Sequence, residues 1–353
     1  MKILYVGTRH SYDSAGAISK QLDSHDFIVW YSSLKKFRPD QYIVVPFWFN
    51  EVMRDRGKEA MNQELLEVIR KGKPDFSFFA VGADELTFET LKSIQRMSGL
   101  TTIYICGDDS WRFESTSRHF APFYTWTLTS EWRAIEKYKK IGCTNVIYYQ
   151  SWPNLEIFKR LNVPKDIEVS FIGTGGPARA KVVTAVRKAG IPVLVRGRGW
   201  LEGEATELEM VELTARSKIA LALNGSSFYF GLRSLARLFF KRSGRLVKPD
   251  FMHFFQNLQE WRGKLTPQIK GRMFEVPACG AMQIAEQVVK IESFYTPDKE
   301  IVIYKNTKEL IEKLRYYLSH DTEREAIAQA GYQRTITDHT AQKRLESIFA
   351  RIL

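Results

Sequence analysis

The segment from Lys270 to Glu286, KGRMFEVPACGAMQIAE, groups side chains that could bind a nucleotide diphosphate. Lys270 and Arg272 stand at the start of a short predicted helix, which Gly280 would end. Unpaired N–H groups in the first turn of a helix attract phosphate, and two neighbouring cations strengthen that attraction. Glu275 could accept two hydrogen bonds from a ribose diol. The segment therefore predicts a nucleotide-diphosphate site, followed by an apolar strand that ends at Glu286.

Pro277 limits where this helix can begin. Proline is tolerated near the start of a helix, so the positive end is expected just upstream of it. A simpler interpretation is also open, in which Arg272 and Glu275 form a surface ion pair three residues apart on an ordinary helix. The local pattern does not decide between the two.

Other strand ends in the second half offer further ligand contacts, because ligands of open α/β sheets bind at the carboxyl ends of strands. The strand VSFI is followed by GTGGPAR, from which Arg179 and Lys181 would point toward a diphosphate. Arg179 is the strongest candidate there, since its planar fork can bind phosphate oxygens in pairs. Trp200 ends a further strand and could stack on a base. Asn224 ends the strand IALALN and would turn the chain toward the ligand.

Two loops in the first half carry polar groups at strand ends. In GTRHSYDSAG, Gly7 could let backbone N–H groups approach a phosphate or sugar, although a simple turn explains it equally well, and His10 could touch a sugar. Asp108 and Asp109 follow the strand IYIC. Adjacent carboxylates raise one another's pKa, which can keep one protonated or poised as a base. The alternative is that Asp109 or Ser110 caps a helix beginning at Trp111.

Several segments of the chain also match, in order, the pattern of a known family. Residues 272–286 are similar to its signature segment, and residues 301–344 to its closing segment, which ends in a His-Thr pair and an Arg. Earlier parts of the pattern resemble residues 61–79, 103–113 and 169–179. The family is that of the CgeB-like glycosyltransferases, a branch of the GT-B superfamily related to the retaining family-four glycosyltransferases.

The resemblance implies a GT-B architecture, with two doubly wound Rossmann-like domains that face a central cleft. It implies sugar transfer from a nucleotide-diphosphate donor without a metal ion, and it places the loop of Asp108 beneath the sugar. During such a transfer charge builds on the departing diphosphate, so cations aimed at it stabilise the transition state. The sequence agrees with this, since it has no Asp-x-Asp motif and no cluster with metal-ligand spacing.

One position departs from the family pattern. Related retaining enzymes often carry two glutamates eight residues apart, the first on the transferred sugar and the second on the ribose. Glu275 matches the second, whereas Pro267 stands in place of the first. The sugar contact is therefore absent or supplied elsewhere, and retention of configuration rests on kinship. Two other classes stay open: an inert relative that binds sugar nucleotides or glycans, and a GT-B sugar-nucleotide epimerase.

Strand-like runs alternate with helix-length stretches along both halves, which predicts parallel sheets covered on both faces. The length of 353 residues also favours two domains. We place an N-terminal, acceptor-side domain at residues 1–155 and a nucleotide-sugar-binding domain at residues 166–339. In the fold that the resemblance implies, the final helix crosses back onto the first domain, and we assign that role to residues 340–353.

Basic residues are concentrated in an insertion at residues 226–268. Between Gly225 and Arg272 the chain has ten Lys or Arg and two acids, which is two thirds of its net charge of +12. Leucines at near-helical spacing among arginines predict a basic amphipathic helix over residues 232–248. Such a helix could lie on an anionic bilayer, hold an acidic or lipid-phosphate acceptor, or simply bury its apolar stripe. No known nucleic-acid-binding motif accompanies the charge.

The remaining composition argues against other classes. No apolar run approaches the roughly 18 residues of a membrane span, and the amino terminus lacks the apolar core of a signal peptide. Cys106, Cys143 and Cys279 suit neither a disulfide framework nor a zinc site. We therefore expect a cytoplasmic protein that needs no cofactor besides its nucleotide-sugar donor and that serves cell-surface polysaccharide or spore-coat type glycan synthesis.

Overall fold

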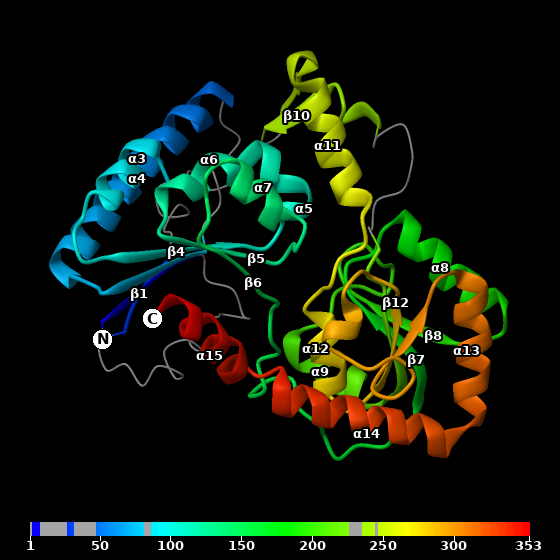
Figure 1. Cartoon of the computed structure of the whole chain (residues 1–353). Coiled ribbons are helices and arrows are strands. Elements are labelled where there is room, and N and C mark those ends of the chain that lie inside the picture. Colours follow the sequence, from blue (N-terminus) through cyan, green and yellow to red (C-terminus); the bar gives the residue numbers. More distant parts are fainter. Residues whose placement is uncertain (1, 8–26, 32–46, 81–85, 226–234, 244–245) are drawn as a thin grey trace. The chain divides into compact units, whose positions relative to one another are not determined.

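The computed structural model describes residues 2–7, 27–31, 47–80, 86–225, 235–243 and 246–353 (Figure 1). The chain divides into two compact units, Met1–Tyr149 with Leu345–Leu353, and Gln150–Arg344. Each unit is built on its own parallel sheet. The predicted fold class, two doubly wound α/β domains, is confirmed.

Six parallel strands form the sheet of the first unit, in the order β2-β1-β3-β4-β5-β6. They are β1 (Ile3–Gly7), β2 (Phe27–Tyr31), β3 (Phe76–Ala80), β4 (Thr101–Cys106), β5 (Trp126–Thr129) and β6 (Val146–Tyr148). Every residue of β1 is buried, as expected of an inner strand in a parallel sheet with both faces covered. Because the strands are parallel, the carboxyl ends of β1 and β4 lie at the same edge of the sheet.

The helices of the first unit include one from the end of the chain. They are α3 (Phe47–Gly72), α4 (Phe88–Gln95), α7 (Ala134–Lys140) and most of α15 (Ala341–Ile352), which is red in Figure 1. The ring of Phe349 in α15 lies edge-on to Phe76 and Phe78 of β3, with ring centroids 6.1 and 6.0 Å away. Residues 345–353 therefore complete the packing of the first sheet.

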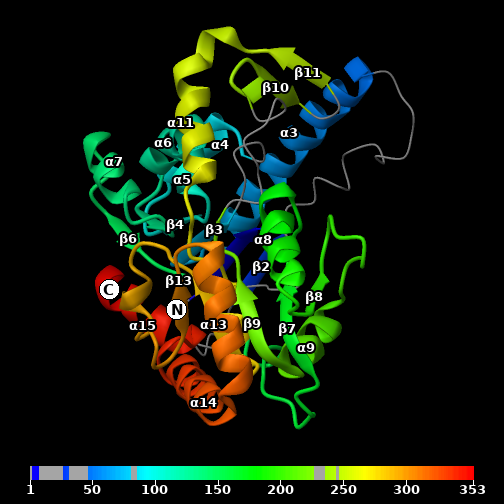
Figure 2. The same ribbon diagram turned by 90° about the vertical axis from the view of Figure 1, so that its right-hand side faces the viewer.

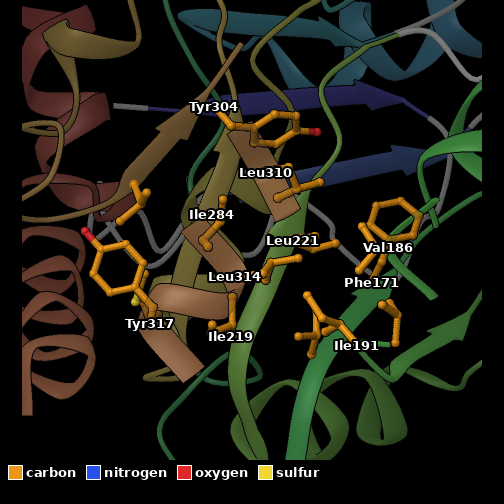
Figure 3. Close-up of a cluster of buried hydrophobic side chains, with 14 of the residues drawn as sticks. Phe171, Val186, Ile191, Ile219, Leu221, Ile284, Tyr304, Leu310, Leu314 and Tyr317 are labelled. Atoms are coloured by element: carbon orange, nitrogen blue, oxygen red, sulfur yellow. The ribbon is translucent and has the colours of Figure 1, made fainter. Parts of the chain in front are cut away.

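Five parallel strands form the sheet of the second unit, in the order β13-β12-β9-β7-β8. They are β7 (Ile167–Ile172), β8 (Val193–Arg196), β9 (Ser217–Ala222), β12 (Met282–Glu286) and β13 (Val302–Tyr304). Figure 3 shows the core on one face of this sheet, where Ile219, Leu221 and Ile284 pack with Leu310 and Leu314 of α13 (Thr307–Ser319). These strands match the apolar runs of the sequence.

Four further helices accompany this sheet, namely α8 (Pro177–Lys188), α9 (Glu207–Ala215), α12 (Arg272–Ala278) and α14 (Asp321–Asp338). A capping box between Thr206 and Glu209 starts α9. Pro277 lies near the end of α12 and not in its first turn, so the prediction that the helix begins just before this proline is wrong. The helix tolerates Pro277 because it ends one residue later, at Ala278. The missing N–H of the proline therefore costs few of the backbone hydrogen bonds of the helix.

The basic insertion differs from the prediction. The structure has no continuous amphipathic helix over the described part of residues 232–248. Instead β10 (Phe240–Ser243) pairs antiparallel with β11 (Leu246–Pro249), and α11 (Phe254–Leu265) follows. The leucine spacing looked helical, but the β-branched and aromatic residues flanking Gly244 favour a hairpin. We call the described residues 235–243 and 246–265 the arm.

Within the described ranges, none of the helices combines the length and the apolar character that a membrane crossing requires.

Candidate nucleotide site

Two arginines come together at the carboxyl edge of the second sheet, and we call them the arginine pair. Arg179 comes from the first turn of α8 and Arg272 is the first residue of α12. Their guanidinium carbons lie 5.5 and 5.9 Å from the ring centroid of Phe171, near the end of β7. Burial and then the charge of Arg272 lower the pKa of Arg179. A bound polyanion would relieve this crowding of like charges.

Arg179 is held in place by the loops around it. Its Nη1 donates to the carbonyl of Thr174 at 2.7 Å, and its Nη2 donates to those of Leu223 and Gly225 at 3.0 and 3.3 Å. The loops after β7 and β9 are thereby joined through one side chain. The predicted pairwise contact of its fork with phosphate would have to replace some of these hydrogen bonds, so Arg179 acts in this structure mainly as a fixed charge.

Arg272 can approach Phe171 because Gly173, in the loop after β7, has no side chain between them. A Cβ at Gly173 would lie 3.3 Å from the Arg272 guanidinium and 3.1 Å from the Phe171 ring. Trp200 closes this loop from the other side, since its indole N–H donates to the carbonyl of Gly173 at 2.8 Å. Its ring also lies edge-on to Phe171. Trp200 therefore shapes the loop, and its stacking on a base stays a prediction.

Asn224 is buried and serves the backbone. Its Nδ2 donates to the carbonyl of Glu286 at 2.9 Å. The carboxylate of Glu286 accepts from the N–H of Gly225 at 2.6 Å. These bonds fix the end of β9 against the end of β12, so the structure assigns Asn224 to positioning this edge. Sequence reasoning noted Glu286 only as the end of a strand, although a carboxylate at a strand end was the available signal.

Glu275 stands one turn after Arg272. Burial raises the pKa of Glu275, and the neighbouring charge of Arg272 acts in the opposite direction. Both side chains line a cavity with hydrophobic and threonine neighbours, and its volume of about 10 Å³ is enough for one water. A ribose would need the side chains that line this cavity to move. No ribose site is therefore preformed beside Glu275, and its contact with a ribose stays a prediction.

The segment at residues 301–344, which resembles the closing segment of the family, packs against α12. His339 is buried and packs edge-on against Phe274 of α12, with ring centroids 5.1 Å apart. Arg344 donates to Nδ1 of His339 at 3.1 Å, so Nε2 carries the proton and donates to the carbonyl of Phe294 at 2.8 Å. Burial lowers the pKa of His339 to about 4, which keeps the ring neutral. Sequence comparison had given these residues no role.

Two further predicted site residues, Lys270 and Gly280, lie just before and just after α12. Gly280 has a φ of +76° and ends α12 at the opposite, amino edge of the sheet, where Lys165 donates to its carbonyl at 2.7 Å. It lies at the other end of the sheet from Arg272, so a role of Gly280 in ligand binding stays a prediction that its position does not favour. Its conformation explains the glycine. Lys270 is exposed just before α12 and donates to the side chain of Gln268 at 2.7 Å.

Asp109 faces the interior of the first unit. Its Oδ2 accepts from the hydroxyls of Thr129 at 2.6 Å and Tyr138 at 2.8 Å. Burial raises the pKa of Asp109, and Asp108 contributes least among the causes. The predicted effect of adjacent carboxylates is therefore minor. Asp108 is exposed and precedes the short helix α5 (Asp109–Arg112), so it is the member of the pair that can reach a ligand.

We expect Asp109 to make the stability of the protein depend on pH. An acid whose pKa is raised on folding stabilises the native state below its unfolded pKa, and that stability is lost as the pH rises above about 4. The slope from one such group is at most about 1.4 kcal/mol per pH unit. Thermal unfolding of Asp109→Asn should show a weaker decline between mildly acidic and neutral pH than the wild type. Equal declines would contradict this assignment.

The other predicted site residues of the first unit are Gly7 and His10. Gly7 is the last residue of β1, and a Cβ there would lie 2.7 Å from the ring of Tyr5, so packing accounts for this glycine. His10 lies outside the described residues. Across the described ranges, no group of three or more His, Cys, Asp or Glu side chains is arranged to hold a metal ion.

Two Rossmann-like units, each built on its own parallel sheet, are the parts of a GT-B fold, and the arginine pair lies at the carboxyl edge of the second sheet. Residues 179–350 match the family described as glycosyl transferase-like. Spore protein CgeB of Bacillus subtilis (strain 168) is 22% identical over 305 residues, which cover 83% of this chain and 89% of CgeB. The resemblance to CgeB-like glycosyltransferases is therefore confirmed.

Solved structures agree on the fold. HepE of Anabaena in complex with UDP matches with a TM-score of 0.61 and 8% identity over all of both chains. UDP-GlcNAc 2-epimerase from Neisseria meningitidis, bound to UDP-GlcNAc, matches with a TM-score of 0.53 and 12% identity over 99% of this chain and 100% of its own. At these identities the similarity shows the fold and not the reaction.

Proposed function

We propose that the protein is a metal-independent glycosyltransferase, which moves a sugar from a nucleotide-diphosphate donor to a glycan, a lipid-linked or another acceptor. The observation that carries the proposal is the arginine pair at the strand-end edge where α/β proteins bind ligands. Its two like charges, next to the carboxylate of Glu275, suit a nucleotide diphosphate better than a neutral ligand. The match to the glycosyl transferase-like family supports this choice.

In the proposed reaction the bond between the anomeric carbon and the diphosphate breaks as the acceptor oxygen attacks. Negative charge then grows on the diphosphate, which Arg179 and Arg272 would stabilise without a metal ion. Arg179 is already fixed by three carbonyl oxygens, so little reorganisation is needed at that moment. A uridine donor is supported by HepE, a structural neighbour in complex with UDP.

The remaining parts of the proposal concern the acceptor side. Asp108, exposed at the carboxyl edge of the first sheet, is our candidate for contact with the sugar or acceptor. Retention of configuration is proposed from kinship, with Pro267 in the place of a sugar-binding glutamate. A role in cell-surface or spore-coat type glycan synthesis in the cytoplasm completes the proposal.

Incubation with UDP-, GDP-, dTDP- and CMP-sugars in separate reactions tests the proposal, with and without a metal chelator. Release of free nucleotide from one donor, unchanged by the chelator, is the expected result. An Arg272→Ala variant should release far less. Absence of release from every donor, in the presence of a mixture of glycan and lipid-linked acceptors, would favour an inert binding relative.

A sugar-nucleotide epimerase is the second candidate, since an epimerase shares the fold. Nuclear magnetic resonance of the donor after incubation separates the two. A transferase leaves the configuration of the unreacted donor sugar unchanged, whereas an epimerase converts it to an epimer. Conversion without any glycosylated product would replace our proposal.

A further inference from the structure

The described chain before and after the arm lies beside the candidate nucleotide site. The arm follows Asn224 and Gly225 at the end of β9, and the backbone N–H of Gln268, just after it, donates to the carbonyl of Asn224 at 3.3 Å. Asn224, before the arm, and Gln268, after it, therefore lie together at the carboxyl edge of the second sheet, which also carries Arg272. A surface bound by the arm would therefore be held by the same unit whose carboxyl edge carries the candidate nucleotide site.

The arm exposes an unusual amount of apolar surface. Of the eleven large hydrophobic side chains that are exposed in the described part of the chain, five lie between residues 239 and 255. Met252 is 97% exposed, Phe255 79% and Phe251 61%, while Phe239 and Phe240 are 40% and 38% exposed. We call these five side chains the apolar patch. Single exposed hydrophobics are ordinary, but a group of this kind marks a contact surface.

Three rings of the patch lie close together, and the arm has little core beneath them. Ring centroids lie 6.1 Å apart between Phe239 and Phe251, and 5.9 Å apart between Phe240 and Phe251. Figure 2 shows the β10–β11 hairpin beside α11, and Asn257 of α11 donates to the carbonyl of Leu238 at 3.2 Å. Among arm residues whose side chains are described, Leu238 and Asn257 are buried. The side chains of the apolar patch are thus not buried by packing within the arm.

Positive charge accompanies the patch. Residues 235–265 contain seven Lys or Arg and two acids. One acid, Asp250, is engaged within the arm, where it lies 2.5 Å from Nδ1 of His253 and accepts from Asn257 at 3.2 Å. In the hairpin register Lys241 stands opposite Lys248. The segment around the apolar patch is therefore strongly basic.

We propose that the arm docks the protein on an anionic lipid bilayer, with the apolar patch inserted at the interface and the Lys and Arg residues on the lipid headgroups. Aromatic and aliphatic side chains together with surrounding cations are the combination that interfacial binding requires. A second copy of the chain fits less well, because two surfaces of this charge repel each other. The inference rests on the proposed function in one respect, in that an arm at the donor edge would bring the site to a lipid-borne acceptor.

Vesicle flotation with the full chain tests the proposal. We expect the wild type to float with phosphatidylcholine vesicles that contain about 30% phosphatidylglycerol, and not with phosphatidylcholine alone. High salt should reduce flotation, since part of the attraction is electrostatic. The triple variant Phe251→Ser, Met252→Ser, Phe255→Ser should lower the partition coefficient by about tenfold or more.

A matched control separates the patch from exposed apolar surface in general. The double variant Leu201→Ser, Leu208→Ser removes side chains that are 104% and 81% exposed outside the arm, and it should float like the wild type. Neutralising Arg237, Lys241 and Arg242 to Gln gives a second variant, expected to lose the response to anionic lipid while the apolar patch stays intact. Equal thermal unfolding of all variants shows that folding is preserved.

Donor chemistry is measured in parallel, without vesicles, as nucleotide release with a water-soluble acceptor. The triple variant should retain it, so a failure of the transferase proposal and a failure of the membrane proposal give different results. A wild type that does not float, or a triple variant that floats equally well, would overturn the membrane assignment. So would binding of single-stranded RNA by the wild type without flotation, which would move the arm to nucleic acid.

Discussion

Replacing Arg272 by alanine is expected to lower kcat by about 100-fold to 1,000-fold, with a much smaller effect on the Kd of the donor nucleotide. The reason is that the charge on the diphosphate grows only as the glycosidic bond breaks, so a guanidinium aimed at it stabilises the transition state more than the bound donor. Arg272 also adds to the like-charge crowding around Phe171 before a ligand arrives. Steady-state kinetics and calorimetry of nucleotide binding measure the two effects separately.

The control is an arginine of the same unit that does not touch the site. Arg216 is paired with Asp166 and Glu212 at the surface, and Arg216→Ala should leave kcat unchanged. Arg272→Lys tests whether the charge or the planar fork matters, and partial rescue points to charge. Equal losses in kcat and in donor affinity would mean that Arg272 only anchors the donor.

Replacing Glu275 by alanine is expected to weaken nucleotide binding by about 1 to 3 kcal/mol, through the loss of charge-assisted hydrogen bonds. Calorimetry with the free nucleoside diphosphate measures this directly. Because burial raises the pKa of Glu275, its carboxylate becomes protonated under milder acid than usual. Wild-type affinity should therefore fall on moving from neutral to mildly acidic pH, and Glu275→Gln should show less of this decline.

Glu312 provides the matched control for this experiment. It is exposed on α13 and lies within 4.0 Å of Lys308, so Glu312→Ala should bind nucleotide like the wild type. The ribose assignment is withdrawn if Glu275→Ala keeps full affinity. In that case the buried carboxylate would serve the packing of α12, next to the small cavity that it lines.

Much of the fold could be predicted because parallel strands buried on both faces leave a strong apolar signature. The runs that became β7, β9 and β12 were recognisable in this way. The arm was harder, since Leu235 and Leu238 fit a helix while the residues that follow pair as a hairpin. Local spacing cannot decide between these when cross-strand partners supply the stabilisation.

The site could be predicted only as far as strand ends reveal it. Arg272 and Arg179 were found because both follow strands or start helices near a strand end, but the hydrogen bonds that fix Arg179 depend on carbonyls far away in the sequence. The burial of Asp109 depends on Tyr138, from a helix that follows another strand. No local pattern announces such partners. His339 was visible in the family pattern, yet only the packing around Phe274 explains it.

The contact of Phe349 with Phe76 and Phe78 has a consequence for biosynthesis. Domains usually fold as they emerge from the ribosome, beginning with the amino-terminal one. Here the first sheet gains a covering helix from residues that are translated after the whole of the second unit. Nascent chains that stall within the second unit should therefore expose apolar side chains of β3 that Phe349 has not yet covered. Such chains should depend on chaperones until residues 345–353 have left the exit tunnel.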